Sequence, residues 1–474
     1  MPYITGERKQ GLLLPSSIED YINPSDPVRA YDAFVNQVDI TELGIQTEPN
    51  RVGAPEFDPR AMLKLLVYGY SYGVRSSRKL ERATHHNLSF IWLTGGLQPD
   101  HKTIARFRRD NQAALSNILK ACAHVCLKLG LVEGNTLFVD GTKVHANASM
   151  KNTWTEKRCL ESLKDIDSRI ARILSECEQA DASEQGNPSL VKMRECLGKQ
   201  GKLKEKIQGV LKDLQAGQKN ATNTTDPESV RLRSNGRLGV GYNCQSVVDD
   251  KHGLIVHSDV VQASCDSNQF SLQIEKAQQA LGKPCATACA DAGYASTEDL
   301  KKSLDEGMDV IVPSARQVKD PSSRVKKEHF AYDAKDDCYR CPQGHLLRYI
   351  GDHKQTKSRI YAVGDPEQCR QCPLFRRCTN SDQGRRVERL FLEDVRERIE
   401  QRYLQADAQA VYRRRKLRVE HPFGHLKQNL GIRSFLLRGL AGVKAEAALA
   451  ATAFNLVRIT TILGPEAFVQ RLAA

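Results

Sequence analysis

The sequence predicts an α/β protein with an all-helical N-terminal region and a cysteine-rich insertion. Apolar residues recur at helical spacing across residues 58–130. Two short apolar segments, 137–140 and 285–291, are typical of buried strands, and each ends in a carboxylate. Five closely spaced cysteines follow between residues 338 and 378. Strands that are interspersed with helices in this way favour the α/β class.

The composition points to a partner that carries negative charge. Hydrophobic residues make up 40% of the 474 residues, enough for a sizeable core, and the formal net charge is +13. Lysine and arginine that neutralise phosphates release condensed counterions, so this charge favours nucleic acid. The alternative is a soluble basic protein without such a partner.

The chain is expected to be cytoplasmic, with no membrane partner. Residues 1–21 lack a basic start followed by an apolar run, and no stretch approaches the roughly 18 apolar residues that span a bilayer. Fourteen cysteines in such a chain argue against a disulfide framework. Most of them, including Cys122 and Cys285, are expected to be small buried core residues.

Residues 1–130 are predicted to form a helical DNA-binding domain. Asp58 and Pro59 are typical of a helix start, and Pro99 with Asp100 opens a second helix whose Ile104 faces a core. A helix, a turn and a basic helix are a candidate DNA-reading module, although a solvated basic face is the alternative. The predicted DNA contacts of this module are Arg75, Arg78, Lys102, Arg106 and Arg109.

Further elements are expected along the rest of the chain. Residues 156–220 are polar with helically spaced leucines, which predicts an inserted pair or trio of long helices. Residues 320–385 are expected to be loop-like, basic and rich in cysteine. The remaining expected elements are a linker at 220–235, strands at 239–249, 254–261 and 310–313, and helices at 269–281, 391–429 and 443–463.

Three separated carboxylates are the candidate catalytic residues. Asp140 and Asp291 follow apolar strands, where a carboxylate is either a helix cap or a functional ligand. Glu420 lies in a basic helix, with Lys427 two turns further along the same face. Pro422 disfavours helix at the preceding residue, so a kink or break at His421 is expected.

Gathered carboxylates suit one kind of chemistry. Cleavage of a phosphodiester needs an activated water or 3′-hydroxyl and a stabilised leaving oxygen, and two Mg²⁺ ions can supply both. Hard cations prefer oxygen ligands, and Mg²⁺ retains several waters, so a few carboxylates suffice. Without metal the carboxylates would repel one another. Such a site predicts strict dependence on metal.

These motifs together resemble bacterial insertion-sequence transposases of the DDE class. The resemblance covers nearly the whole chain and rests on 57–111, on LFVDGTKVHANAS around Asp140, on ADAGYAS around Asp291, and on 412–427. In the last motif of the family, a Tyr and an Arg precede the Glu, and a Lys follows it by seven residues. Glu420 and Lys427 match that spacing.

The resemblance implies both a fold and a set of roles. Residues 131–474 would form a ribonuclease H-like catalytic domain, interrupted by the helical insertion 156–220 and the cysteine-rich insertion 330–385. Asp140, Asp291 and Glu420 would hold two Mg²⁺ or Mn²⁺ ions. The implied partner is double-stranded DNA, both transposon ends and target, bound by a homodimer or larger assembly associated with the bacterial nucleoid.

The resemblance also implies DNA contacts beside Glu420. Lys427 would contact a phosphate near the scissile end. The family's upstream Tyr and Arg fall on Arg413 and Lys416, whereas Tyr412 stands one residue early. All four residues are therefore candidate DNA contacts.

The five clustered cysteines predict a structural zinc site. Cys338 with Cys341, and Cys369 with Cys372, form two CxxC pairs, and Cys378 follows. Five candidates compete for four tetrahedral positions, and His345 is a further option. Resemblance to related transposases favours Cys341, Cys369, Cys372 and Cys378, with Cys338 as the alternate. The other interpretation is a set of reduced, unligated thiols.

Two other functions are compatible with the same residues. A metal-dependent endonuclease without strand transfer needs the same three carboxylates. A catalytically silent DNA-binding protein derived from a transposase is the third hypothesis, which the intact set of carboxylates disfavours.

Overall fold

The chain folds into two compact units of mixed α and β structure. The computed structural model describes residues 17–49, 55–182, 189–217, 220–234, 236–314, 317 and 325–474. Residues 1–16 lie outside the described part. They include most of the segment from which the absence of a secretory signal was predicted. Unit 1 comprises Met1–Asp266, Gln273–Pro284 and Lys416–Ala474, and unit 2 comprises Ser267–Leu272 and Cys285–Arg415.

Unit 1 begins with helices at the predicted places. The side chain of Asp58 caps the second helix by accepting from the N–H of Arg60 at 2.9 Å, and Asp100 caps the fifth by accepting from Thr103 at 2.8 Å. The elements are η1 (Ile18–Tyr21), α1 (Val28–Gln37), α2 (Pro59–Ser71), α3 (Ser77–His86), α4 (Leu88–Leu93), α5 (His101–Asp110) and α6 (Gln112–Lys128).

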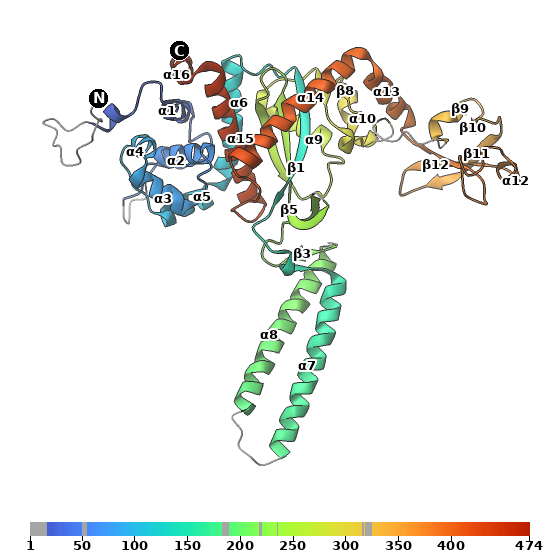
Figure 1. The fold of residues 1–474 in the computed structure, drawn as a ribbon, viewed down its shortest axis with the longest axis horizontal. Helices are drawn as coiled ribbons and strands as arrows, with labels where there is room; N and C mark the ends of the chain where they lie inside the picture. Colours follow the sequence, from blue (N-terminus) through green and yellow to red (C-terminus); the bar gives the residue numbers. More distant parts are fainter. Residues whose placement is uncertain are drawn as a thin grey trace, which may run out of the picture. The chain divides into compact units, whose positions relative to one another are not determined.

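The strands of unit 1 are antiparallel. β5 (Arg237–Asp249) lies between β1 (Thr136–His145) on one side and β4 (Val230–Ser234) and β6 (Ile255–Val261) on the other (Figure 1). The prediction that the first strand ends at Asp140 is wrong. β1 continues to His145 because β5 pairs with it along its whole length, so Asp140 lies in mid-strand. The predicted linker at 220–235 also contains a strand, β4.

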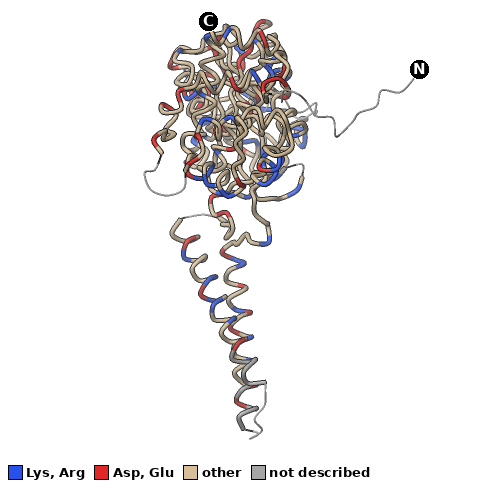
Figure 2. The backbone as a smooth tube through the Cα atoms, turned by 90° about the vertical axis from the view of Figure 1, so that its left-hand side faces the viewer, with Lys and Arg blue, Asp and Glu red and all other residues tan. Residues whose placement is uncertain are grey.

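The insertion at 156–220 is a helical hairpin. α7 (Glu156–Ala182) and α8 (Ser189–Ala216) run side by side and are inserted between the short paired strands β2 (Thr153–Trp154) and β3 (Thr222–Asn223) (Figure 1). A narrow apolar seam that includes Ile166 and Ile207 joins them. Both signs of charge lie along the hairpin (Figure 2).

The most apolar helix of unit 1 is α15 (Leu440–Leu463), which is followed by α16 (Pro465–Ala473). By length and composition α15 alone, among the described helices, is apolar enough to cross a membrane. Most of it is buried, however, against α2, α6 and β6. The side chain of Asn455, on α15, makes two hydrogen bonds with the backbone of Ile255. It accepts from the N–H at 2.9 Å and donates to the carbonyl at 2.7 Å. These contacts identify α15 as a core helix.

A buried ion pair joins the helical region to α15. Arg75 donates to Glu446 Oε1 at 2.8 Å and to the carbonyls of Gly431 and Ser434 at 3.0 Å each. The Glu446 side chain is fully buried and also accepts from the backbone N–H of Leu436 at 2.9 Å. Arg75 is therefore a structural residue, and the prediction that it contacts DNA is corrected.

Unit 2 contains two groups of strands. The short parallel pair β7 (Thr287–Cys289) and β8 (Asp309–Ile311) is accompanied by η3 (Ala292–Tyr294) and α10 (Thr297–Asp305). Helix α9 (Phe270–Leu281) lies mostly in unit 1 and begins in unit 2.

The region predicted to be loop-like is a five-stranded antiparallel sheet, so that prediction is wrong. Its strands follow the order β13-β12-β11-β10-β9. Tyr339, Leu347, Tyr361 and Val387 form its small core together with Phe330, and their side chains share one face of the sheet. The elements are η4 (Lys327–His329), β9 (Ala331–Asp333), β10 (Cys338–Arg340), β11 (Leu346–His353), β12 (Ser358–Val363), α12 (Glu367–Arg370) and β13 (Arg386–Leu390).

The chain returns to unit 1 through a long helix. α13 (Glu393–Leu404) precedes α14 (Ala406–Gly424), and the division between the units falls between Arg415 and Lys416. The expected break at His421 is wrong, because α14 continues through Pro422. The irregularity comes one turn later, where η5 (His425–Asn429) has π-helical geometry. A wider, π-helical turn of this kind is one way in which a helix changes its local geometry.

We predict that the Arg75–Glu446 pair is required for stability. Arg75→Ala leaves a buried carboxylate without its cation, which costs about 3–5 kcal/mol. The measurement is urea unfolding of the full chain. A double Arg75→Met, Glu446→Leu variant removes both charges and is expected to lose less than either single charge-deleting variant. Equal losses in the single and double variants would contradict this account.

A second prediction concerns His257 on β6. The side chain keeps some exposed area, but its Nε2 is buried, and burial lowers the pKa from 6.5 to about 4. As the pH falls below 6.5, the unfolded chain takes up a proton on His257 before the folded chain does. The free energy of unfolding therefore decreases as the pH falls from 6.5 toward 4. The loss is at most about 3 kcal/mol. Between pH 7 and 4, wild type should lose stability relative to His257→Gln by up to this amount in unfolding titrations; parallel curves would contradict the assignment.

Candidate functional site

One part of the candidate site lies on the face of β1. Asp140 and Thr142 are two residues apart on the strand, so their side chains share a face. On β5, Ser246 stands opposite Asp140, and Cys244 stands opposite Thr142. Lys427, from η5, donates a hydrogen bond from Nζ to the hydroxyl of Thr142. The fold thus brings together Asp140 and Lys427, which are far apart in sequence.

Lys427 is held in a partly buried position between a carboxylate and a thiol. Burial lowers its pKa, whereas Cys244 and Asp140 act in the opposite direction. Burial raises the pKa of the Cys244 thiol to about 12, so Cys244 is a neutral neighbour at physiological pH. Asp140 Oδ1 accepts from the N–H of Gly141 at 3.0 Å. The arrangement places an ammonium group beside Asp140, on the side of the Thr142 hydroxyl.

The second predicted carboxylate lies in unit 2. Asp291 follows β7 by two residues and caps η3, where its Oδ1 accepts from the N–H of Gly293 at 2.8 Å. Tyr412, on the unit 2 part of α14, lies close enough to Asp291 to feel its charge. Burial is the main reason that the Tyr412 pKa is raised, and the ring packs edge-on against Tyr403 at 5.1 Å.

The third carboxylate, Glu420, is exposed on the unit 1 part of α14. Arg413 and Lys416, which precede it by seven and four residues, are also exposed and share its helical face. Arg418 points elsewhere and pairs with Asp250 at 3.4 Å. Within the described ranges, no group of three or more His, Cys, Asp or Glu side chains has the arrangement of a metal site.

Four of the predicted DNA contacts in the helical region are exposed. Lys102, Arg106 and Arg109 are spaced by four and three residues, so they share one face of α5. Arg78 is exposed on α3, which packs against α5 and is joined to it by Glu81 and His101, 2.9 Å apart. The two helices therefore present a basic surface, from which Arg75 is excluded by its ion pair.

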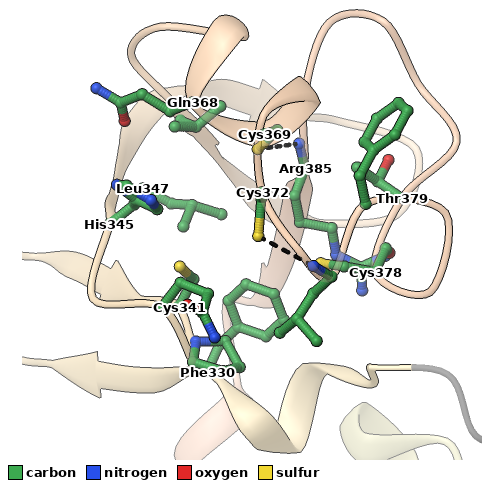
Figure 3. A pocket seen from close by; sticks show the side chains of 15 residues that line it. Phe330, Cys341, His345, Leu347, Gln368, Cys369, Cys372, Cys378, Thr379 and Arg385 are labelled. Atoms are coloured by element: carbon green, nitrogen blue, oxygen red, sulfur yellow. Dashed lines mark hydrogen bonds between the residues drawn. The ribbon is translucent and has the colours of Figure 1, made fainter.

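Four of the five clustered cysteines surround one small cavity in unit 2. Cys341, Cys369, Cys372 and Cys378 line a space of about 30 Å³ beside His345 (Figure 3).

Cys338 does not line this cavity. It is the first residue of β10 and stands opposite Arg348 of β11. Its side chain lies on the face of the sheet away from the core, because the next residue, Tyr339, points into the core.

Backbone donors already point at two of the thiols. The N–H of Arg385 donates to Cys369 Sγ at 3.4 Å, and the N–H of Leu374 donates to Cys372 Sγ at 3.4 Å (Figure 3). Such donors stabilise sulfur as a thiolate, which is the form that binds metal. The turn after Cys341 closes through the N–H of Gly344, which donates to the Cys341 carbonyl at 2.8 Å. Four thiols are the type and number of ligands that a structural zinc ion takes.

Sequence reasoning missed Thr142, Cys244 and Ser246. Thr142 was visible in the motif around Asp140, where the period of two puts it on the same face as the carboxylate. Cys244 and Ser246 depend on the register between β1 and β5, which lie about 100 residues apart, and no local signal sets that register.

Two segments match known protein families. Residues 340–460 match the family model described as a transposase DDE domain, and residues 16–110 match the one described as a transposase domain (DUF772). These matches confirm the resemblance to DDE transposases. No curated protein matches the sequence. Among solved structures, the chain is similar to piggyBac transposase in a synaptic complex with hairpin DNA, with 10% identity, a TM-score of 0.34, and coverage of 94% of this chain and 79% of that chain.

Proposed function

We propose that this chain, whose two matched segments are of transposase type, is the transposase of an insertion sequence. It binds the terminal repeats of the element, cleaves the DNA at those ends, and joins the free 3′-hydroxyls to target DNA in the bacterial cytoplasm. The observation that carries this proposal is the pair of family matches, because the match to the transposase DDE domain, residues 340–460, includes both Glu420 and Lys427. Joining two ends calls for at least a homodimer on DNA.

The strands support a ribonuclease H-like catalytic domain. Such a fold combines antiparallel and parallel strands in one mixed sheet flanked by helices. Unit 1 supplies the antiparallel strands β1, β5 and β6, and unit 2 supplies the parallel pair β7 and β8. In this proposal, the hairpin of α7 and α8 and the five-stranded sheet are the two insertions.

Asp140, Asp291 and Glu420 are proposed to hold two Mg²⁺ or Mn²⁺ ions. All three supply carboxylate oxygens, which are the ligands that such hard cations prefer. When bound, the ions supply an activated nucleophile and stabilise the leaving oxygen. Asp291 enters this role with one oxygen already bound to the N–H of Gly293, which fixes the direction of its carboxylate.

Lys427 is proposed to contact a DNA phosphate beside Asp140. The hydrogen bond to Thr142 removes freedom from a long side chain, so the ammonium is positioned before DNA arrives. Arg413, Lys416 and Tyr412 extend the contact along α14. The basic surface of Arg78, Lys102, Arg106 and Arg109 is proposed to bind the terminal repeat.

The thiols of Cys341, Cys369, Cys372 and Cys378 are proposed to bind a structural zinc ion. A closed tetrahedral site keeps no open position for a substrate, so this ion would stabilise the fold and leave catalysis to the carboxylates. The core of the five-stranded sheet consists of only five buried residues, which makes a metal crosslink valuable.

The transposase proposal predicts that Glu420→Gln abolishes chemistry and spares binding. Losing one ligand of an ion that contributes several kcal/mol should lower the rate at least ~100-fold. The measurement is cleavage and joining of a labelled duplex that bears the element's ends, with Mg²⁺ or Mn²⁺. Glu466→Gln, an exposed glutamate on α16, is the matched control and should remain active. Cleavage by wild type without joining would favour an endonuclease, and binding without cleavage would favour a silent DNA-binding protein.

The zinc proposal predicts different outcomes for two cysteine variants. Purified wild type and Cys338→Ser should each contain one zinc per chain by atomic absorption, because Cys338 lies on the opposite face of the sheet. Cys369→Ser should lose the ion and unfold at a lower temperature. A wild-type protein without zinc, or equal loss in both variants, would reject the assignment.

A further inference from the structure

The five-stranded sheet of unit 2 has one covered face and one open face. Tyr339, Leu347, Tyr361 and Val387 point into the core on the covered face. Because side chains alternate along a strand, the residues between them occupy the other face. That face carries Arg340, Arg348, Ala362 and Arg386.

The strand register places these arginines close together. Ala362 on β12 stands opposite Arg348 on one side and opposite Arg386 on the other. Two strand spacings separate the backbones at Arg348 and Arg386 by about 10 Å. Arg340 lies on β10, two residues beyond Cys338, which is the partner of Arg348. It is therefore a diagonal neighbour of Arg348, at about 7–8 Å.

The three arginines are exposed and have no carboxylate partner within the described residues. Other arginines of the unit are paired: Arg389 with Glu397 at 3.1 Å, Arg396 with Glu400 at 3.1 Å, and Arg402 with Asp309 at 2.7 Å.

Two carboxylates do share the open face, and each has a local partner. Asp333 accepts from the N–H of Lys335 at 3.0 Å, and Glu388 accepts from the hydroxyl of Ser358 at 3.3 Å. Both carboxylates stay negatively charged, so the arginine cluster, Arg340, Arg348 and Arg386, leaves an excess of positive charge on this face around a small residue, Ala362.

An outward sheet face is ordinarily solvated and polar, so exposure alone decides nothing. The choice of residues is more informative. Like charges so close on one face repel each other, which costs free energy unless an anion covers them. Arginine also binds a phosphate through two N–H groups at once, which lysine cannot do. A rigid sheet holds such groups at fixed spacing.

We propose that the arginine cluster binds the phosphodiester backbone of duplex DNA. This inference rests on the proposed transposase function and adds a contact surface separate from the carboxylates and from α3 and α5. Ala362 is buried between Arg348 and Arg386, so a phosphate would contact the exposed guanidinium groups of these two residues. The contact is independent of DNA sequence, since phosphates carry no base identity.

The test compares two triple variants of the full chain with the same change in charge. The first is Arg340→Gln, Arg348→Gln, Arg386→Gln. The matched control is Lys301→Gln, Lys357→Gln, Arg370→Gln, three cations of the same unit that pair with Asp305, Glu298 and Glu367. Binding to the element's end and to an unrelated duplex is measured over a range of salt concentrations.

The expected result is a change in the salt dependence of binding. Each phosphate contact contributes about 0.9 to the slope of log affinity against log salt, so the cluster variant should lose about 2–3. The loss should be the same for both duplexes, and the control should keep the wild-type slope. A triple Arg→Lys variant should keep most of the slope but bind more weakly.

The outcomes distinguish failure of the arginine contact from failure of the proposed transposase function. Cleavage and joining by wild type together with an unchanged slope in the cluster variant overturns the arginine contact alone. A change in oligomeric state, measured by sedimentation, with no change in slope, would assign the face to a second copy of the chain and also overturns it. Failure of wild type to bind DNA overturns both proposals. If the triple variant unfolds, single Arg348→Gln and Arg386→Gln variants should each lower the slope by about 1.

Discussion

The nine-residue ladder between β1 and β5 is the constraint on which the rest of unit 1 depends. It pairs Leu137 through His145 with Gly241 through Asp249 without interruption. Asp140 therefore sits within a paired strand, where both neighbours are held by hydrogen bonds. A carboxylate on a loop would move with the loop, but this one cannot change direction without breaking the sheet. The same ladder sets Cys244 and Ser246 around it.

The C-terminal segment reaches Asp140 only because buried polar contacts bring it back. Asn455 ties α15 to the backbone of β6, and Glu446 ties it to Arg75. These contacts fix the segment that precedes α15, and Lys427 lies in that segment. Polar groups in the core thus help to position Lys427, the proposed phosphate contact. Their loss is expected to affect both stability and the position of Lys427.

Local patterns in the sequence predicted most elements, and long-range pairing explains where they failed. Helix starts at Asp58 and Asp100 depend on neighbouring residues, so they were readable. The end of β1 was misplaced because its partner lies about 100 residues away. Arg75 looked like a DNA contact because its partner, Glu446, is 371 residues distant. The identity of the three carboxylates came from a resemblance, since spacing alone leaves caps and ligands indistinguishable.

The open face and the thiol cluster of unit 2 have a common physical origin. A single sheet with a core of five residues on one face has little apolar surface to bury, so it needs another source of stability and leaves its second face uncovered. Four thiols close one end of the covered face, where Cys341 and Cys378 pack against the core. On the second face Cys338, Ser358 and Ala362 are buried, whereas Arg340, Arg348 and Arg386 are exposed. Arginines can be placed there without cost to the core, which makes this face a suitable surface on which to carry a ligand contact.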